Sequence, residues 1–332
     1  MSKKSEKNIG KTKQTKAPAA SLDEAKRQVR ERYEKALSSF TEKLKKDPNV
    51  TAIIIYGSMA RNDVWEKSDI DVYVLVREVK LFQTSFCIEE DGVFFNVDVD
   101  KEFDYCRYLE RDKGNPWFFS IHSAIRIEYC VNESLKEFLK EIVKMGQSDR
   151  ALLFFNNAAY LLGDMEKIEQ WLWKGNPLYA QKMILSAADN YANMLLTLEN
   201  KPAHRDAVIR VMKYAPELIE PVYVKPMRAE MTNAQIEEAL AFLKKFLKEN
   251  IELLKQPVID YMSDGQIRTV TALVKHFNCN SHAIYLIFEF LAENEVVCRT
   301  GEPVSITPKS RKTLEEAAYV YTGGTMNDKG YY

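Results

Sequence analysis

Two short apolar runs on either side of a glycine–serine pair constrain the fold more than any other feature of the sequence. Residues 50–56 (VTAIIIY) predict a buried strand that ends at Gly57-Ser58, and residues 70–76 (IDVYVLV) predict a second strand. Residues 59–65, between them, can form a short helix. A strand, a tight turn and a second strand predict a small sheet within an α+β domain.

Two acidic residues mark the start of the second predicted strand. Because side chains alternate faces along a strand, Asp69 and Asp71 project to the same side while Ile70 points into the core. Two adjacent carboxylates repel each other unless a cation lies between them, and hard oxygen ligands suit Mg²⁺. The N–H groups at Gly57-Ser58 can hold an anion such as phosphate. This stretch therefore predicts a metal site and a phosphate site for a nucleoside triphosphate (NTP).

In this chain, Gly57-Ser58 is followed eleven residues later by Asp69-Ile70-Asp71. This order resembles the signature of nucleotidyltransferases of the DNA polymerase β superfamily. The similarity is greatest to the branch of small bacterial antibiotic nucleotidyltransferases, and it covers about residues 20–145. Arg61 also fits the pattern. Asn62 departs from it, because a glycine commonly follows that arginine.

The resemblance implies a role for each residue of the motif. It implies that the triphosphate binds to Gly57, Ser58 and Arg61. It also implies that Asp69 and Asp71 hold two Mg²⁺ ions, in the usual two-metal arrangement.

A third carboxylate on a neighbouring strand belongs to the same implied site. Residues 82–88 and 93–99 predict two further strands, and Asn96, Asp98 and Asp100 share one face of the second. Asp98 lies within the strand and is the favoured third carboxylate, and Asp100 is the alternative. The resemblance implies that Asp98 binds one of the two metal ions, and that this ion, or Asp98 acting as a base, activates the acceptor hydroxyl.

The chain beyond the predicted catalytic domain, residues 21–146, has a helical period. Residues 147–256 predict a helical bundle. In its predicted helix 177–198, the polar pair Asp189-Asn190 interrupts a run of small and apolar residues. In the antibiotic-modifying relatives a helical domain forms one wall of the acceptor site. Asp189 and Tyr191 are therefore candidate acceptor-binding residues, and the alternative is that Asp189 lies on a solvated face or in a helix–helix hydrogen bond.

Residues 257–322 predict a third unit that resembles a winged helix, with two helices, a hairpin and a last helix at 309–321. The exposed side of its second helix carries Glu289 and Glu293 but no Lys or Arg that could neutralise phosphates. This pattern argues against a nucleic-acid partner and favours packing or a homodimer.

The composition restricts the remaining classes of protein. The 332 residues are 46% hydrophobic and 29% charged, with a net charge of −1, as in soluble globular proteins. No apolar run approaches the roughly twenty residues that span a bilayer. The five cysteines form no close pairs and predict reduced thiols in the cytoplasm. The basic residues 1–20 predict a disordered tail, and we expect residues 323–332 to fray.

Together these features predict a Mg²⁺-dependent enzyme that moves a nucleoside monophosphate from an NTP, with ATP as the first candidate, to a hydroxyl of a small-molecule acceptor such as an antibiotic. The alternative is a nucleotidyltransferase-fold sensor or DNA-binding regulator that uses the C-terminal winged helix. The sequence leaves the acceptor and the choice of NTP open.

Overall fold

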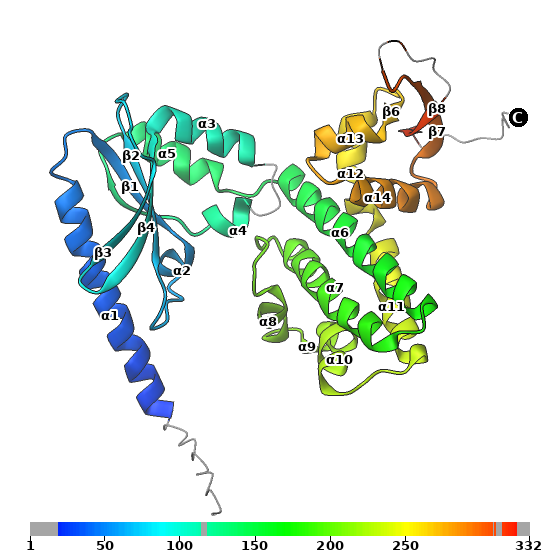
Figure 1. Cartoon of the computed structure of the whole chain (residues 1–332), viewed down its shortest axis with the longest axis horizontal. Helices are drawn as coiled ribbons and strands as arrows, with labels where there is room; N and C mark the ends of the chain where they lie inside the picture. The colour runs from blue at the N-terminus through cyan, green and yellow to red at the C-terminus, as the bar shows by residue number, and fades with distance from the viewer. Residues whose placement is uncertain (1–18, 114–117, 308, 310–313, 324–332) are drawn as a thin grey trace, which may run out of the picture. The chain divides into compact units, whose positions relative to one another are not determined.

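The computed structural model describes residues 19–113, 118–307, 309 and 314–323 (Figure 1). Residues 1–18 and 324–332, where the two tails are predicted, lie outside the described part. Contacts between Cα atoms divide the chain into two compact units. The first comprises Met1–Glu102 and Ile125–Glu133, and the second comprises Phe103–Ala124 and Ser134–Tyr332.

The first unit contains a five-stranded mixed sheet. Its elements are α1 (Ala19–Leu44), β1 (Val50–Tyr56), α2 (Gly57–Ala60), β2 (Ile70–Val76), β3 (Ser85–Glu90), β4 (Val93–Lys101) and β5 (Arg126–Cys130). The strand order is β3-β4-β2-β1-β5, with β2 and β4 parallel and the other neighbours antiparallel. Both β1 and β2 begin and end at the residues predicted from the apolar runs.

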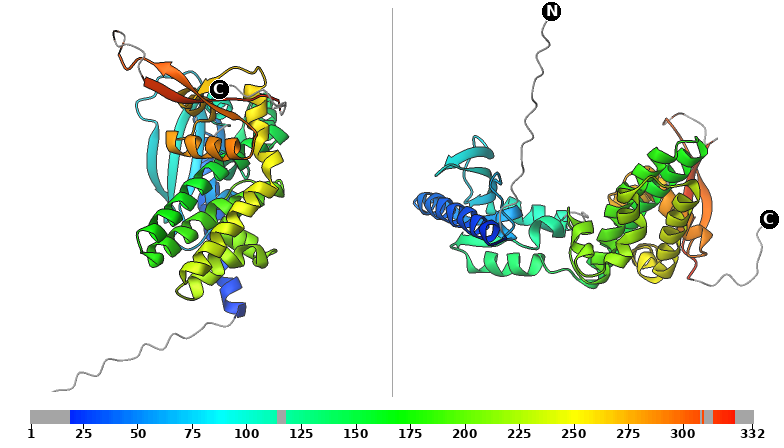
Figure 2. Two further views of the ribbon diagram at one scale, coloured as in Figure 1. Left: turned by 90° about the vertical axis from the view of Figure 1, so that its right-hand side faces the viewer. Right: turned by 90° about the horizontal axis from the view of Figure 1, so that it is seen from below.

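Helix α1 packs on one face of this sheet (Figures 1 and 2). It buries Tyr33, Leu37 and Phe40 against alternate apolar residues of the strands, and the Phe40 ring stacks on Phe95 with centroids 4.4 Å apart. Each such side chain stabilises the fold by about 1.5–3 kcal/mol when fully buried. The core therefore fixes where the helix lies, and the opposite strand face carries the polar residues of the candidate site.

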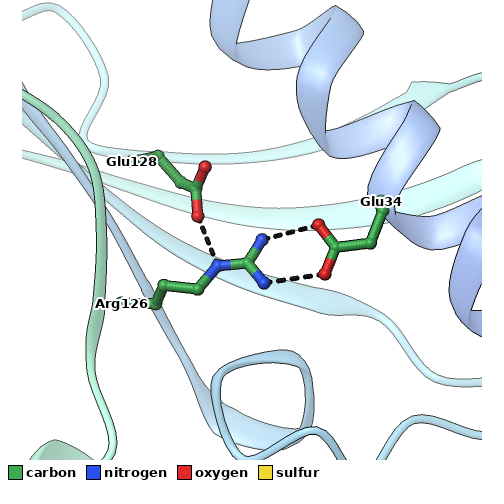
Figure 3. Close-up of polar contacts among 3 residues, drawn as sticks. All are labelled: Glu34, Arg126 and Glu128. Atoms are coloured by element: carbon green, nitrogen blue, oxygen red, sulfur yellow. Dashed lines mark hydrogen bonds and ion pairs between the residues drawn. The ribbon is translucent and has the colours of Figure 1, made fainter.

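A polar clamp also joins α1 to the edge strand β5 (Figure 3). The Arg126 guanidinium donates two parallel hydrogen bonds to Glu34, with Nη1–Oε1 at 2.7 Å and Nη2–Oε2 at 2.9 Å. Its Nε donates to Glu128 on the same strand. The hydrogen bonds from Arg126 to Glu34, together with the two negative charges, raise the pKa of the guanidinium.

A second clamp joins α1 to the other edge strand, β3. The Glu90 carboxylate accepts hydrogen bonds from Lys43 Nζ at 2.6 Å and from Ser39 Oγ at 2.5 Å. Two hydrogen bonds lower the pKa of Glu90: the one from Lys43 has the larger effect and the one from Ser39 the smaller. The long helix is thus fixed to both edges of the sheet by charged side chains and to the middle strands by apolar ones.

The second unit is mainly helical, with a small sheet near its C-terminal end. Its elements are α3 (Glu102–Asp112), α4 (Phe118–His122), α5 (Glu133–Ile142), α6 (Gln147–Trp173), α7 (Pro177–Leu198), α8 (Ala207–Met212), α9 (Pro216–Ile219), the π-helix η1 (Glu220–Val224), α10 (Lys225–Arg228), α11 (Asn233–Glu249), α12 (Ile251–Met262), β6 (Arg268–Thr269), α13 (Val270–Phe277), α14 (Ser281–Glu293), β7 (Cys298–Val304) and β8 (Leu314–Val320). Helices α6 and α7 lie side by side, and one hydrophobic core runs from Phe154 in α6 to Tyr319 in β8. The predicted bundle and the predicted winged-helix-like unit therefore share a single core.

The C-terminal elements have a winged-helix-like order, but the predicted last helix is wrong. Residues 314–320 form β8, which pairs with β7 along its length and with β6 at Arg268 and Thr269. The Leu, Glu and Ala residues of this segment are good helix formers, but intrinsic helix propensity is small and tertiary contacts can override it. Pairing on both edges and burial of Tyr319 outweigh that preference.

Helix α14, which corresponds to the second helix of the predicted winged helix, packs against α6. Phe288 meets Phe155 edge-on with ring centroids 6.3 Å apart, and His282 Nε2 lies 2.6 Å from Glu166 Oε2. Farther along α14, Glu289 accepts a hydrogen bond from Tyr319 at 2.6 Å. The helix is thus engaged with its own unit. Throughout the described ranges, no helix has the length and apolar character needed to cross a bilayer.

We expect Arg126→Lys to lower the free energy of unfolding by about 0.5–1 kcal/mol, because lysine keeps the charge but cannot form the parallel pair of hydrogen bonds to Glu34. Urea unfolding of the full chain, followed by circular dichroism, measures the change. Arg27→Lys is the matched control, since Arg27 is well exposed and, among the residues that the structure describes, its ion pairs are with Glu24 and Glu31 of its own helix. Equal losses in the two variants would contradict a structural role for the clamp.

Candidate active site

After β1 the chain makes the predicted turn at Gly57-Ser58, but the helix that follows differs from the prediction. The predicted helix over 59–65 is a single turn, α2, because Asn62 takes a left-handed conformation with φ +59°. Asparagine tolerates this conformation better than other residues that carry a Cβ. This explains how Asn62 can replace the glycine common in the resembling family. The N–H groups of so short a helix have no acceptor within it, so those of Gly57 and Ser58 suit an anion.

Gly57 is required at this turn for two reasons. Its φ is +72°, and a Cβ built on it would lie 2.2 Å from Oδ2 of Asp71. The contact follows from the antiparallel pairing of β1 and β2, which places Tyr56 opposite Asp71. The carboxylate of Asp71 therefore lies against the bare backbone of the turn, where the sequence predicts a bound phosphate.

Asp69 lies just before β2, at the end of a loop that α1 holds. The Tyr33 hydroxyl, on the buried side of α1, donates to the carbonyl of Ser68, and Arg32 Nη2 donates to the carbonyl of Glu66 at 3.1 Å. These bonds fix the loop immediately before the first carboxylate. Asp69 itself is exposed.

Asn96 joins the two carboxylates. Its Nδ2 donates to Asp69 Oδ2 at 2.5 Å and to Asp71 Oδ1 at 3.3 Å. The parallel register of β2 and β4 places Asn96 directly beside Asp71. The two acids that the sequence predicts to act together are thus within hydrogen-bond reach of one nitrogen atom.

Asp98 lies on the same face but one step farther along the strands. The register places it beside Tyr73, and Asp100 beside Leu75. The Tyr56 hydroxyl donates to Asp98 Oδ2 at 3.4 Å, and the Tyr56 ring stacks on Tyr73 with centroids 4.5 Å apart. The negative charge of Asp98 acts on Asp71. Asp98 thus belongs to the cluster, and Asp100 is farther from it.

The balance of charge at the cluster is unfavourable to the ionised form of Asp71. Partial burial raises the pKa of Asp71 above its usual value, and the charges of Asp69 and Asp98 raise it further. The hydrogen bond from Asn96 and the positive charge of Arg61 oppose that rise. A bound cation would relieve this repulsion, since it favours the ionised form of every carboxylate near it.

The oxygen atoms of Asp69 and Asp71 are donors of the kind that fit a divalent ion. Within the described parts of the chain, no three His, Cys, Asp or Glu side chains form a group that could hold a metal ion. Asp69 and Asp71 are nevertheless close enough to share the Asn96 amide, and oxygen donors of this kind are the ligands that Mg²⁺ prefers. Carboxylate oxygens from these two residues would therefore hold the ion.

The candidate acceptor residues lie on α7 in the second unit. Asp189 is exposed, and its pKa is raised by partial burial and by the charge of Asp206. The neighbouring Asn190 forms a helix–helix hydrogen bond to Asp164 at 2.8 Å. Tyr191 is 1% exposed and packs edge-on against Phe246, so it is a core residue and not an open contact surface. The helical period turns Tyr191 inward, two positions after the exposed Asp189.

Sequence reasoning gave no role to three residues that shape the cluster, namely Tyr33, Tyr56 and Asn96. Tyr33 and Tyr56 belong to apolar patterns that predict core positions. Asn96 was placed on the same face as Asp98, but alternation along a strand gives the face and not the neighbour across the sheet. Only the register of β2 and β4 identifies Asn96 as the residue beside Asp71.

We expect Gly57→Ala to abolish most of the transfer reaction that the sequence predicts. The new Cβ must displace the Asp71 carboxylate, and a misplacement of about 1 Å at a reacting centre can cost on the order of 100-fold in rate. The left-handed backbone adds about 1–2 kcal/mol of strain. Steady-state rates and thermal unfolding measure the two effects separately.

Gly92→Ala is the matched control. Gly92 has φ +71° but no atom within 4 Å of a built Cβ, so its substitution introduces the same backbone strain without touching a carboxylate. We expect both variants to lose similar stability and only Gly57→Ala to lose activity. An equal loss of activity in both would show that the close approach to Asp71 is not important.

Comparisons with known proteins agree with this geometry. Residues 39–116 match the family model "Polymerase beta, Nucleotidyltransferase". Among curated proteins there is no significant match. A solved structure described as a nucleotidyltransferase-like protein from Exiguobacterium sibiricum 255-15 is 15% identical, with a TM-score of 0.58, over 87% of this chain and 99% of that chain. At this identity the similarity concerns the fold. The segment with Gly57, Asp69, Asp71, Asn96 and Asp98 therefore lies in a nucleotidyltransferase-type domain.

Proposed function

We propose that the protein is a metal-dependent nucleotidyltransferase, which moves a nucleoside monophosphate from an NTP to a hydroxyl of a small-molecule acceptor. One observation carries the proposal. Asp69 and Asp71 both accept a hydrogen bond from the side-chain amide of Asn96, and the Asp71 carboxylate lies against the backbone of Gly57. The same side of the sheet thus offers carboxylates for a cation and a bare turn for phosphate.

In this proposal the residues of the turn bind the triphosphate. The N–H groups of Gly57 and Ser58, the Ser58 hydroxyl and the Arg61 guanidinium bind phosphate oxygens. Asp69 and Asp71 would hold Mg²⁺, as the two ions that the resemblance implies. When bound, Mg²⁺ would neutralise charge on the triphosphate and on the leaving pyrophosphate.

The proposed reaction exchanges one O–P bond for another and moves one proton. The oxygen of the acceptor hydroxyl attacks the α-phosphorus and forms the new O–P bond, while the bond to the bridging oxygen breaks and pyrophosphate leaves with the electron pair. Asp98 accepts the proton of the hydroxyl. The Tyr56 hydroxyl donates to Oδ2 of Asp98, which orients the carboxylate and leaves Oδ1 for the proton.

The acceptor is proposed to be a small hydroxyl-bearing molecule, such as an aminoglycoside or a lincosamide. Pairing of the exposed Asp189 carboxylate on α7 with a cationic acceptor stays a prediction from the sequence. Incubation with labelled ATP, and then with the other NTPs, against a panel of aminoglycosides, lincosamides and simple alcohols tests this. Mass spectrometry should show a product heavier by one nucleoside monophosphate, and no adduct with any NTP would contradict the proposed function.

The alternative of a DNA-binding regulator has less support. DNA-binding helix-turn-helix proteins place their second helix in the major groove. Here α14 packs on α6, and its Glu289 is bonded to Tyr319 and Arg299. A helix used in this way offers little cationic surface to phosphates.

Asp71→Asn should lower NTP-dependent transfer at least about 100-fold, because a metal ligand that contributes several kcal/mol is lost. It should not lower the melting temperature when divalent ions are chelated. A carboxyl group whose folded-state pKa is raised destabilises the protein at pH values above that pKa, and stability returns as the pH falls through it. Asparagine removes this cost at neutral pH. A large fall in melting temperature would contradict the prediction.

Two further variants distinguish the candidates for the third acid. Asp98→Asn should lower transfer by about 100-fold or more, as expected for loss of a base. Asp100→Asn should leave most of the activity, because Asp100 lies beside Leu75, away from Asp71. The reverse order of activities would assign the base to Asp100.

An electrophoretic shift assay at low salt should show no sequence-specific binding of the full chain to DNA. The physical reason is the contact of α14 with α6, together with a net charge of −1. Tight binding to one sequence from a random duplex library would favour the regulator instead. Weak binding that disappears at moderate salt is the ordinary behaviour of basic segments.

A further inference from the structure

The strand register places an amide where the expected site calls for a third carboxylate. Asn96 is the direct neighbour of Asp71 across the parallel pair β2–β4, and Asp98 is the neighbour of Tyr73. Residues two apart on a strand are separated by about 6–7 Å. Asn96 is therefore the polar residue of β4 nearest to both Asp69 and Asp71, as its two hydrogen bonds show.

The Asn96 side chain can donate hydrogen bonds to the two carboxylates when no cation is bound, and it can offer an oxygen ligand when one is. As described, Nδ2 donates to both acids and so occupies the place of a positive charge between them. Turning the terminal amide by half a turn exchanges Nδ2 and Oδ1 at nearly the same positions. The oxygen is then a neutral donor of the kind that Mg²⁺ and Ca²⁺ accept.

Asp98 lies farther along the strands, and one of its two carboxylate oxygens contacts Tyr56. Its Oδ2 accepts from the Tyr56 hydroxyl, and the Tyr56–Tyr73 stack lies on the same face of the sheet. The described residues also contain no group of three acidic, histidine or cysteine side chains that could hold a metal ion. Both facts are consistent with a ligand set that is completed by an amide.

We propose that Asn96 completes the divalent-cation site of Asp69 and Asp71, so that the protein holds the ion through two carboxylates and one neutral amide oxygen. This inference rests on the proposed function. A set with one negative charge fewer than three carboxylates binds a free cation more weakly and leaves more of the charge to be supplied by the triphosphate.

The test measures Mn²⁺ binding directly, by the electron paramagnetic resonance signal of the free ion, without NTP or acceptor. Asn96→Ala leaves the net charge unchanged and should weaken binding about tenfold. Asn96→Asp should tighten binding about tenfold, because a carboxylate then stands beside Asp71. Asn96 is exposed, so neither substitution removes core packing.

The pair of variants separates three roles for Asn96. If only charge matters, Asn96→Ala will bind Mn²⁺ as the wild type does. If Asn96 only holds the two carboxylates together, Asn96→Asp will bind no more tightly than Asn96→Ala. Either result overturns the inference, whereas weaker binding by the alanine variant with tighter binding by the aspartate variant supports it.

Two controls complete the experiment. Asn49→Asp adds the same charge at an exposed position just before β1, at the opposite end of that strand from Gly57, and should leave Mn²⁺ affinity within about twofold. A tenfold gain in this variant would overturn the inference, because charge anywhere would then suffice. No Mn²⁺ binding by either the wild type or Asn96→Asp would instead contradict the proposed function itself.

Discussion

The contact between the backbone of Gly57 and the carboxylate of Asp71 is the constraint on which the candidate site depends. Antiparallel pairing brings the end of β1 opposite the start of β2, and the turn must pass the carboxylate without a side chain. The same left-handed turn ends β1 and starts the single turn of α2. The sheet therefore fixes the phosphate-facing backbone and the metal-facing acids relative to each other.

This arrangement concentrates negative charge where part of it is shielded from water, and the rest of the first unit offsets the cost. The apolar face of the same strands packs on α1, and clamps at Glu34 and Glu90 hold that helix at both edges of the sheet. Natural proteins commonly tolerate such local destabilisation at sites that bind ligands. Much of the apolar packing of the sheet lies on the face opposite to the one that carries the acids.

The sequence predicted those parts of the fold that local pattern determines. The ends of β1, β2 and α7 follow from apolar period and from Gly57, Pro177 and the acids, and the structure confirms them. The pattern did not predict β8, because strand pairing overrode the helix propensity of its Leu, Glu and Ala residues. It assigned no role to Asn96, because register is a property of two strands. The α7 period turns Tyr191 into the core, and its role in acceptor binding stays a prediction.

The core that runs from Phe154 to Tyr319 has a consequence for how the second unit opens. Segments that share one core exchange their amide hydrogens together, because neither can unfold without exposing the apolar surface of the other. We therefore expect the winged-helix-like end to unfold together with the α6–α7 pair. Substitutions at α14 would then alter the stability of the bundle as well.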